Sequence, residues 1–189
     1  MLKMIEDELN AHKRTIEKTI EIMIPQIKEA SELVIDTLKN GNKVLFCGNG
    51  GSASDAQHLS AELVGRYKTE RRGLPAMALT TDTSALTAIG NDYGYDRVFD
   101  RQVEALINRG DLLIGISTSG ESLNVLSALL LAKDMGARTI GFTGKGGGKI
   151  KYASDVNLIV PSDDTPRIQE MHILIGHIIC QAVDNAFQS

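Results

Sequence analysis

The feature that most constrains the fold is a series of short apolar segments separated by longer segments with helical periodicity. The apolar segments lie at 43–47, 76–79, 112–116, 138–142 and 156–160, and the helix-like segments at about 52–67, 95–108, 121–134 and 166–187. Strands that alternate with helices connect through right-handed crossovers and form a mostly parallel sheet covered on both faces. We therefore predict one α/β domain over residues 1–189, a three-layer αβα sandwich around a five-stranded, mostly parallel sheet.

Residues 1–40 carry a helical pattern that precedes this alternation. Their apolar residues recur four, three, four, three and four positions apart and form a narrow seam of Ile16, Ile20, Met23, Ile27, Ala30 and Val34. Pro25 is expected to kink or divide the helix, because proline removes an intrahelical hydrogen bond. The seam could pack on its own domain or on another copy of the chain, and the pattern alone does not decide between them.

Composition and charge argue against several classes of protein. The net charge of -4 argues against nucleic-acid binding, since phosphate backbones recruit basic surfaces. No apolar run reaches 18 residues, so no membrane partner is expected, and the polar N-terminus does not resemble a signal peptide. Cys47 and Cys180 lie in apolar runs without metal-binding spacing, which predicts two buried free thiols in a cytoplasmic protein.

Ligands of open parallel sheets bind at the carboxyl ends of the strands, which directs attention to the loops at 47–52, 81–95 and 117–122. The third loop, STSGES, contains four hydroxyl groups and no lysine or arginine: Ser117, Thr118, Ser119 and Ser122. It follows a predicted strand and opens a predicted helix, whose free N–H groups and dipole favour an anion. A helix N-cap needs only one hydroxyl, and four favour a binding site for a phosphate monoester.

Two glycine-rich segments bear on nucleotide binding. The segment TGKGGGKI (143–150) lacks the first glycine and the final Ser/Thr of a P-loop, so it argues against ATP or GTP chemistry and reads as a flexible turn. The segment GNGGSA (48–53) matches a loose dinucleotide-binding pattern directly after a strand, but the acidic residue expected about 20 positions later is absent. A sugar pocket lined by backbone explains these glycines equally well.

A cluster of titratable and amide side chains occurs on two of the predicted helices. His58 and Glu62 stand four residues apart and share one helix face, while the last helix supplies Gln169, His172 and His177. Two imidazoles, a carboxylate and an amide suit zinc, although a surface hydrogen bond also explains the first pair. Gln169 and His177 lie about 12 Å apart along the axis, so they must lean together or serve two chains. His172 falls on a different face, which predicts a packing role.

Together these segments resemble the sugar isomerase (SIS) domain of phosphoheptose isomerases. The resemblance rests on CGNGGSASDAQHLSAELVGRY, AIGNDYG, GISTSGES, FTGKGGGK and RIQEMHILIGH, and it spans the chain nearly end to end. It implies a flavodoxin-like SIS domain preceded by N-terminal helices, and a homotetramer with active sites near subunit interfaces. It also implies conversion of D-sedoheptulose 7-phosphate to D-glycero-D-manno-heptose 7-phosphate through a cis-enediol, toward bacterial lipopolysaccharide. Pro166 departs from relatives that carry an acidic residue there.

The resemblance also assigns roles to particular residues. It implies one zinc ion per subunit on His58, Glu62, Gln169 and His177, with Glu62 and His177 as base and acid. The substrate contacts it implies are Asn49, Gly50, Gly51, Ser52, Glu62, Asn91, Asp92, Ser117, Thr118, Ser119, Ser122 and Gln169. The hydroxyl loop would then hold the phosphate of the sugar while its carbonyl end reaches the titratable cluster.

A second group of SIS-domain proteins offers an alternative from another functional class. These regulatory proteins bind a replication initiator instead of converting a sugar, and the segments ALTTDTSALTAIGND and RIQEMH resemble them as well. They lack the pair that matches Glu62 and His177, whereas this chain retains both residues. The sequence therefore favours the isomerase.

Overall fold

The computed structural model describes residues 1–188 and confirms the α/β architecture. The sheet contains β1 (Val44–Gly48), β2 (Ala76–Ala78), β3 (Leu112–Ser117), β4 (Arg138–Thr143) and β5 (Val156–Ile159). The strand order is β2-β1-β3-β4-β5, and all four neighbouring pairs are parallel. This is the flavodoxin-like order, in which the direction of strand addition reverses between β1 and β3.

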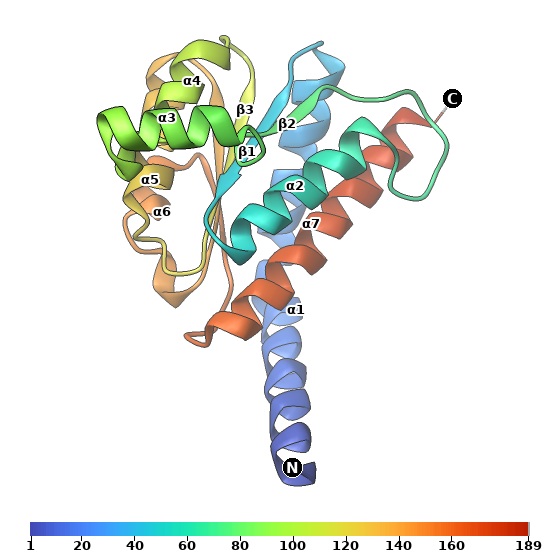
Figure 1. Ribbon diagram of the computed structural model, residues 1–189. Coiled ribbons are helices and arrows are strands. Elements are labelled where there is room, and N and C mark those ends of the chain that lie inside the picture. The colour runs from blue at the N-terminus through green and yellow to red at the C-terminus, as the bar shows by residue number, and fades with distance from the viewer. Residues whose placement is uncertain (189) are drawn as a thin grey trace.

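Helices cover both faces of the sheet and make three layers (Figure 1). One face is covered by α1 (Leu2–Lys39), α2 (Gly51–Val64) and α7 (Thr165–Phe187). The other carries α4 (Asp100–Leu106), α5 (Leu123–Asp134) and α6 (Ile150–Ala153), with α3 (Thr83–Tyr93) beside them. Two short 3₁₀ segments, η1 (Tyr95–Arg97) and η2 (Lys145–Gly147), complete the structure.

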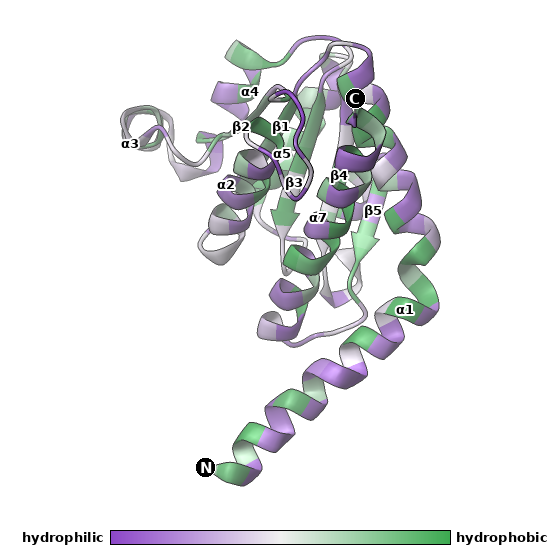
Figure 2. Ribbon diagram, turned by 90° about the vertical axis from the view of Figure 1, so that its right-hand side faces the viewer, coloured by the Kyte–Doolittle hydropathy of each residue, from purple (hydrophilic) through white to green (hydrophobic). Residues whose placement is uncertain are grey.

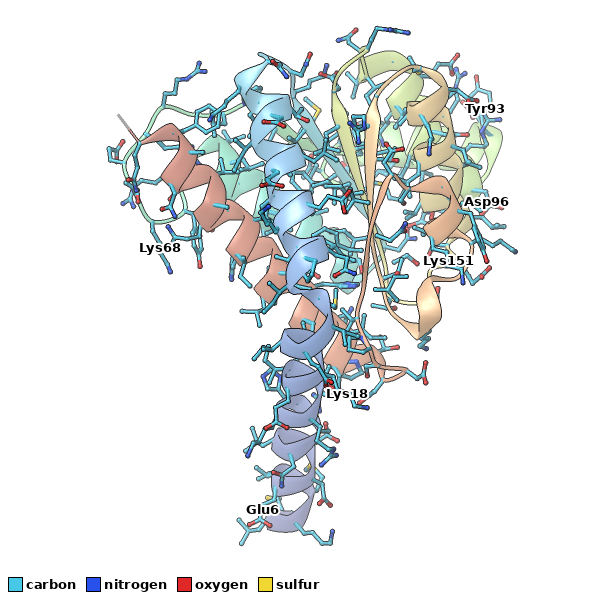
Figure 3. All side chains as sticks on the ribbon, turned by 180° about the vertical axis from the view of Figure 1, so that it is seen from behind. Glu6, Lys18, Lys68, Tyr93, Asp96 and Lys151 are labelled. Atoms are coloured by element: carbon cyan, nitrogen blue, oxygen red, sulfur yellow. The ribbon has the colours of Figure 1, made fainter. Side chains whose placement is uncertain are left out.

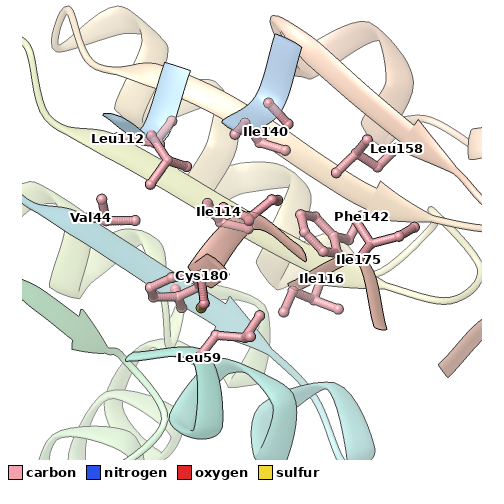
Figure 4. Close-up of a cluster of buried hydrophobic side chains, with 14 of the residues drawn as sticks. Val44, Leu59, Leu112, Ile114, Ile116, Ile140, Phe142, Leu158, Ile175 and Cys180 are labelled. Carbon is pink, nitrogen blue, oxygen red and sulfur yellow. The ribbon is translucent and has the colours of Figure 1, made fainter. Parts of the chain in front are cut away.

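Alternation of side chains along the strands divides the core into two layers. Val44 and Phe46 of β1 point toward α1, α2 and α7, where they join the cluster drawn in Figure 4, while Leu45 and Cys47 point the other way. Gly115 lets α5 approach the sheet closely, because a Cβ there would lie 2.8 Å from side-chain atoms of Leu129 and Val125. Apolar packing on both faces thus holds the carboxyl ends of the central strands in place.

The N-terminal helix differs in part from its prediction. Pro25 does not divide α1, which is continuous from Leu2 to Lys39, although its axis bends along its length (Figure 2). Pro25 is exposed, so water can bond the carbonyl group that proline leaves free. Most of the seam packs in the chain's own core: Met23, Ile27, Ala30 and Val34 are buried, Ile16 is half-buried and Ile20 is 57% exposed. The first ten residues are exposed and project from the body (Figure 1).

The 81–95 segment, predicted as a loop, contains the helix α3. Asp82 caps it by accepting a hydrogen bond from the Ala85 N–H at 3.0 Å, and none of its residues is buried. Leu86 and Ile89, three positions apart, pack part-buried against the core, and one such pair is a much weaker signal than the stripe of a buried helix, which explains why the pattern missed it. The predicted helix at 95–108 is also shorter, because it consists of η1 followed by α4. Among residues 1–188, no helix is long and apolar enough to span a membrane.

Candidate active site

The candidate site begins where the central strands β1 and β3 end side by side. Asn49 follows β1, and Asn124 lies in the first turn of α5, after β3. Their side chains form a reciprocal amide pair, each Nδ2 donating to the other's Oδ1 at 2.9 Å, and the Tyr95 hydroxyl donates to Asn49 Oδ1 at 3.1 Å. This pair ties together the N-termini of α2 and α5, so two helix ends that favour anions converge on one place.

Asn124 was not singled out in the sequence, although it was detectable. It is 3% exposed and stands in a helix whose other buried residues are apolar. A buried amide needs hydrogen-bond partners, so its position in the first turn after the hydroxyl loop was the available signal. The side chain of Asn49, predicted to contact substrate, is largely occupied by this pairing. Its main contribution in this structure is to link the two loops.

The hydroxyl loop has the arrangement of an anion-binding loop. The Ser117 Oγ lies 2.9 Å from Ser122 Oγ and 3.4 Å from Ser119 Oγ, so three of the predicted side chains converge. Ser122 occupies the N-cap position of α5 but makes no side-chain capping bond. The first amides of the helix are therefore not taken up by that hydroxyl, which argues against a simple N-cap as the reason for the serines.

The glycine-rich segment after β4 supports this loop. Thr118 O accepts the Gly144 N–H at 3.1 Å, and Gly120 O accepts the Ile150 N–H at 3.1 Å. Gly120 has φ +69°, and a Cβ there would lie 2.2 Å from Gly147 O, so only glycine fits. The segment predicted as a flexible turn is thus bonded to the candidate phosphate loop.

The glycine loop after β1 opens α2 in a similar way. Gly50 has φ +55°, Gly51 is the first residue of α2, and Ser52 is buried with its N–H donating to Asn49 O. A Cβ on Gly51 would lie 2.3 Å from Nε2 of Gln169, so this glycine makes room for the Gln169 side chain. The predicted site residues Gly51, Ser52 and Gln169 therefore lie together at the N-terminus of α2.

Close packing of α2 on α7 brings three titratable residues together. A Cβ on Gly176 would lie 2.5 Å from a methyl carbon of Leu59, so the two helices approach closely beside His177. His58 Nε2 lies 2.9 Å from His177 Nε2 and 3.4 Å from Glu62 Oε1. Burial, with repulsion from His58 as a second cause, lowers the pKa of His177. A carboxylate and two imidazoles from two helices thus form one cluster, as predicted.

The predicted zinc site can be tested against this cluster. Ligand atoms about 2.0–2.1 Å from a tetrahedral zinc ion lie roughly 3.3 Å from one another. The two separations from His58 Nε2, 2.9 Å and 3.4 Å, come close to that value, so the cluster could accept an ion with small side-chain shifts. Within residues 1–188, however, no three His, Cys, Asp or Glu side chains form a ready metal-binding group. Zinc therefore stays a prediction.

Asp55, which the sequence did not single out, adds a second carboxylate near the cluster. It lies three residues before His58 on α2, and its Oδ2 is buried without a hydrogen-bond partner among residues 1–188. Burial raises the pKa of Asp55 to about 6, although the neighbouring His58 charge lowers it. Its i, i+3 spacing to His58 was the only signal in the sequence.

Two predicted substrate contacts, Asn91 and Asp92, stay predictions. Asn91 and Asp92 occupy the exposed C-terminal end of α3, where the Asn91 Nδ2 donates to Asp92 Oδ1 at 2.8 Å. Within residues 1–188 no hydrogen bond joins either residue to the hydroxyl loop or to the titratable cluster. His172, in contrast, is buried and donates from Nε2 to Thr143 O at 3.1 Å, which confirms its packing role.

Comparison with known proteins agrees with this geometry. The family model of the SIS domain matches residues 9–144. A phosphoheptose isomerase of Aliarcobacter butzleri (strain RM4018) is 68% identical over 185 residues, covering 98% of both chains. One of Helicobacter pylori (strain P12) is 60% identical over 184 residues, covering 97% of this chain and 96% of that one.

Solved structures give the same result. The phosphoheptose isomerase GmhA from Neisseria gonorrhoeae superposes with a TM-score of 0.93 at 46% identity, and one from Francisella tularensis with 0.94 at 40%. In each case 97% of this chain and 98% of the other are covered. These relatives are named as isomerases, which favours the enzyme over the initiator-binding alternative. The chain belongs to the phosphoheptose isomerase family of SIS-domain proteins.

Proposed function

We propose that this chain interconverts D-sedoheptulose 7-phosphate and D-glycero-D-manno-heptose 7-phosphate, a step toward the heptose of bacterial lipopolysaccharide. The observation that carries the proposal is the cluster in which His58 Nε2 lies 2.9 Å from His177 and 3.4 Å from Glu62. A carboxylate beside an imidazole supplies the base and the acid that aldose–ketose isomerisation requires. The names of the full-length relatives support the same reaction.

The phosphate group is assigned to the hydroxyl loop. Ser117, Ser119 and Ser122 converge there, and the dipoles of α2 and α5, whose N-termini meet at this place, favour an anion. The loop contains no lysine or arginine, so neutral hydroxyl and amide donors would bind the phosphate dianion there. Anchored at this end, the open-chain sugar extends along α2 toward Glu62.

The reaction then needs four proton transfers, two in each half. Glu62 removes a proton from C1, the C1–H electron pair forms the C1–C2 double bond, and the C2 oxygen takes a proton from His177. The product of this half is a cis-enediol. In the second half the O1 hydroxyl returns a proton to His177, its electron pair forms the aldehyde, and C2 takes the proton from Glu62. Proximity of both groups to the same two carbons provides the rate enhancement.

The four residues that would hold zinc are His58, Glu62, Gln169 and His177. When bound, such an ion stabilises negative charge on the substrate oxygens. Glu62 can act as a base only while its carboxylate is free of strong coordination, so we assign it a weak or transient metal contact. Gln169, seated against Gly51, would have to turn toward His177 to join them.

The decisive variant is Glu62→Gln, which keeps the size of the side chain and removes the base. Turnover of sedoheptulose 7-phosphate should fall by about 10²-fold or more, the usual contribution of a general base. Glu104→Gln, on the opposite face in α4, is the matched control and should leave turnover unchanged. Near wild-type turnover by the Glu62 variant would exclude this assignment, and a wild-type protein inert toward every heptulose phosphate would favour the regulatory alternative.

We further propose a homotetramer in which α1 contributes to contacts between chains. Ile20, Ile22 and Ile24 are each at least 50% exposed on α1, next to its projecting N-terminal part. Ile20→Glu should weaken the assembly, because a charge would enter an apolar contact. Ile27 belongs to the same predicted seam but lies in the chain's own core, so a charge there would destabilise the fold and would not test the assembly. Light scattering at micromolar concentration that shows a monomer, or an unchanged assembly in the Ile20 variant, would contradict the proposal.

A further inference from the structure

The segment at 65–75, between α2 and β2, places the ring of Tyr67 against His177, the proposed acid. The Tyr67 ring stacks on the His177 imidazole with centroids 5.1 Å apart and planes inclined by 23°. The His58 ring meets the same imidazole edge-on, with centroids 5.1 Å apart and an angle of 65°. His177 therefore contacts two rings, and of these the Tyr67 ring lies outside the proposed ligand set.

A buried ion pair anchors this segment to α7. Arg71 and Asp184 have fully buried side chains, and the Arg71 Nε donates to Asp184 Oδ1 at 2.8 Å. Asp184 Oδ2 accepts the N–H groups of Lys68 and Thr69 at 2.7 and 2.8 Å, directly after Tyr67. Figure 3 shows Lys68 at the outer edge of the molecule, beside the helix that carries Asp184. The backbone that carries Tyr67 is thus fixed to the helix that carries His177.

The same guanidinium also binds the end of α2. The Arg71 Nη2 donates to Glu62 O at 2.8 Å, and its Nη1 donates to Leu63 O at 2.9 Å and to Gly65 O at 3.1 Å. Carbonyl groups in the last turn of a helix lack intrahelical donors, and here one side chain supplies them. Arg71 therefore connects the backbone of Glu62, the helix that carries His177 and the segment that carries Tyr67.

We propose that Tyr67 is a positioning residue for His177, and that the Arg71–Asp184 pair holds Tyr67 in place. An imidazole rotates over a broad range about its terminal torsion, so packing must select the orientation in which Nε2 faces His58 and Glu62. The Tyr67 ring covers one face of the imidazole and excludes the alternatives. The inference rests on the proposed function of His177, but the orientation of the ring can be measured without activity.

The experiment compares Tyr67→Phe, which retains the stacked ring, with Tyr67→Leu, which removes it. For the Leu variant we expect a fall in kcat of about 10- to 100-fold, the scale of a misplaced catalytic group, with KM changed less than about twofold because the phosphate loop is intact. The Phe variant should retain kcat within about twofold. Tyr152→Leu, at an exposed tyrosine on α6, is the matched control. Unchanged kcat in the Leu variant, or a change confined to KM, would overturn the inference.

A second measurement separates this inference from the proposed function. Crystal structures of the wild type, Tyr67→Phe and Tyr67→Leu report the orientation of the His177 ring whether or not the protein turns over a sugar phosphate. We expect the His177 Nε2 to face His58 in the first two and to rotate away in the third. An unchanged ring in the Leu variant would overturn the positioning role even if Glu62→Gln had established the isomerase. A rotated ring in a protein without isomerase activity would sustain that role and reject the proposed function instead.

Discussion

At the scale of single residues, the buried His172 gives a prediction about pH. Its pKa is lowered by burial to about 4, so the folded protein binds this proton less readily than the unfolded chain, whose histidine titrates near 6.5. The contribution of His172 to the free energy of unfolding therefore has its full value above about pH 6.5 and decreases as the pH falls toward 4. Because of this group, the free energy of unfolding should decrease by about 2 kcal/mol between pH 7 and pH 5.

Urea unfolding at pH 7 and pH 5 measures this effect. His172→Gln keeps a donor for Thr143 O without a titrating group, so its stability should depend less on pH over the same interval. An equal loss of stability in wild type and variant would show that other groups carry the dependence.

The residue scale also shows how far the sequence could define the site. The i, i+4 spacing put His58 and Glu62 on one face of α2, and the structure confirms that they face each other. The contact between His58 and His177 depends on how α2 packs against α7, through Gly176 and Leu59. No local pattern encodes such a distance, and for the same reason the pairing of Asn49 with Asn124 was not predicted.

At the scale of elements, the hydroxyl loop and the start of α5 should act as a remote handle for the phosphate group. Ser119→Ala and Ser122→Ala should mainly raise KM for sedoheptulose 7-phosphate, because a remote group is bound in both the ground state and the transition state. Steady-state kinetics should show a change mainly in KM for the serine variants and mainly in kcat for Glu62→Gln. If dephosphorylated sedoheptulose reacted equally well, this role of the loop would be refuted.

The elements themselves were predictable where they are buried and not where they are exposed. All five strands were found, because two covered faces require nearly continuous apolar runs. The helix α3 was taken for a loop, because no residue in it is buried and its main signal is the capping Asp82. Pro25 was expected to kink or divide α1: the helix is not divided, its axis bends, and contacts with α7 and β5 hold its later turns.

At the scale of the whole molecule, the fold should not depend on metal. The two core layers lie on either side of the sheet and are built from apolar side chains of strands and helices, whereas the titratable cluster lies outside them. A chain of this size buries enough apolar surface to fold without a metal ion. We therefore expect chelation to reduce isomerase activity while the thermal unfolding temperature changes little.

Elemental analysis of protein made without a histidine tag should find about one zinc ion per chain, and re-addition should restore activity. The amide ligand binds weakly, so nickel or copper could replace zinc during purification. Full activity in a metal-free sample would exclude the zinc role, and unfolding on chelation would contradict the independence of the core.

The two buried cysteines can serve as probes of local opening on the two sides of the sheet. Cys47 belongs to the layer beneath α4, α5 and α6, and Cys180 to the layer beneath α1 and α2. Burial raises the pKa of each thiol to about 12, so neither reacts with an alkylating reagent until its surroundings open. Because each thiol lies on its own side of the sheet, their labelling rates report separately how often each helical layer lifts from the strands.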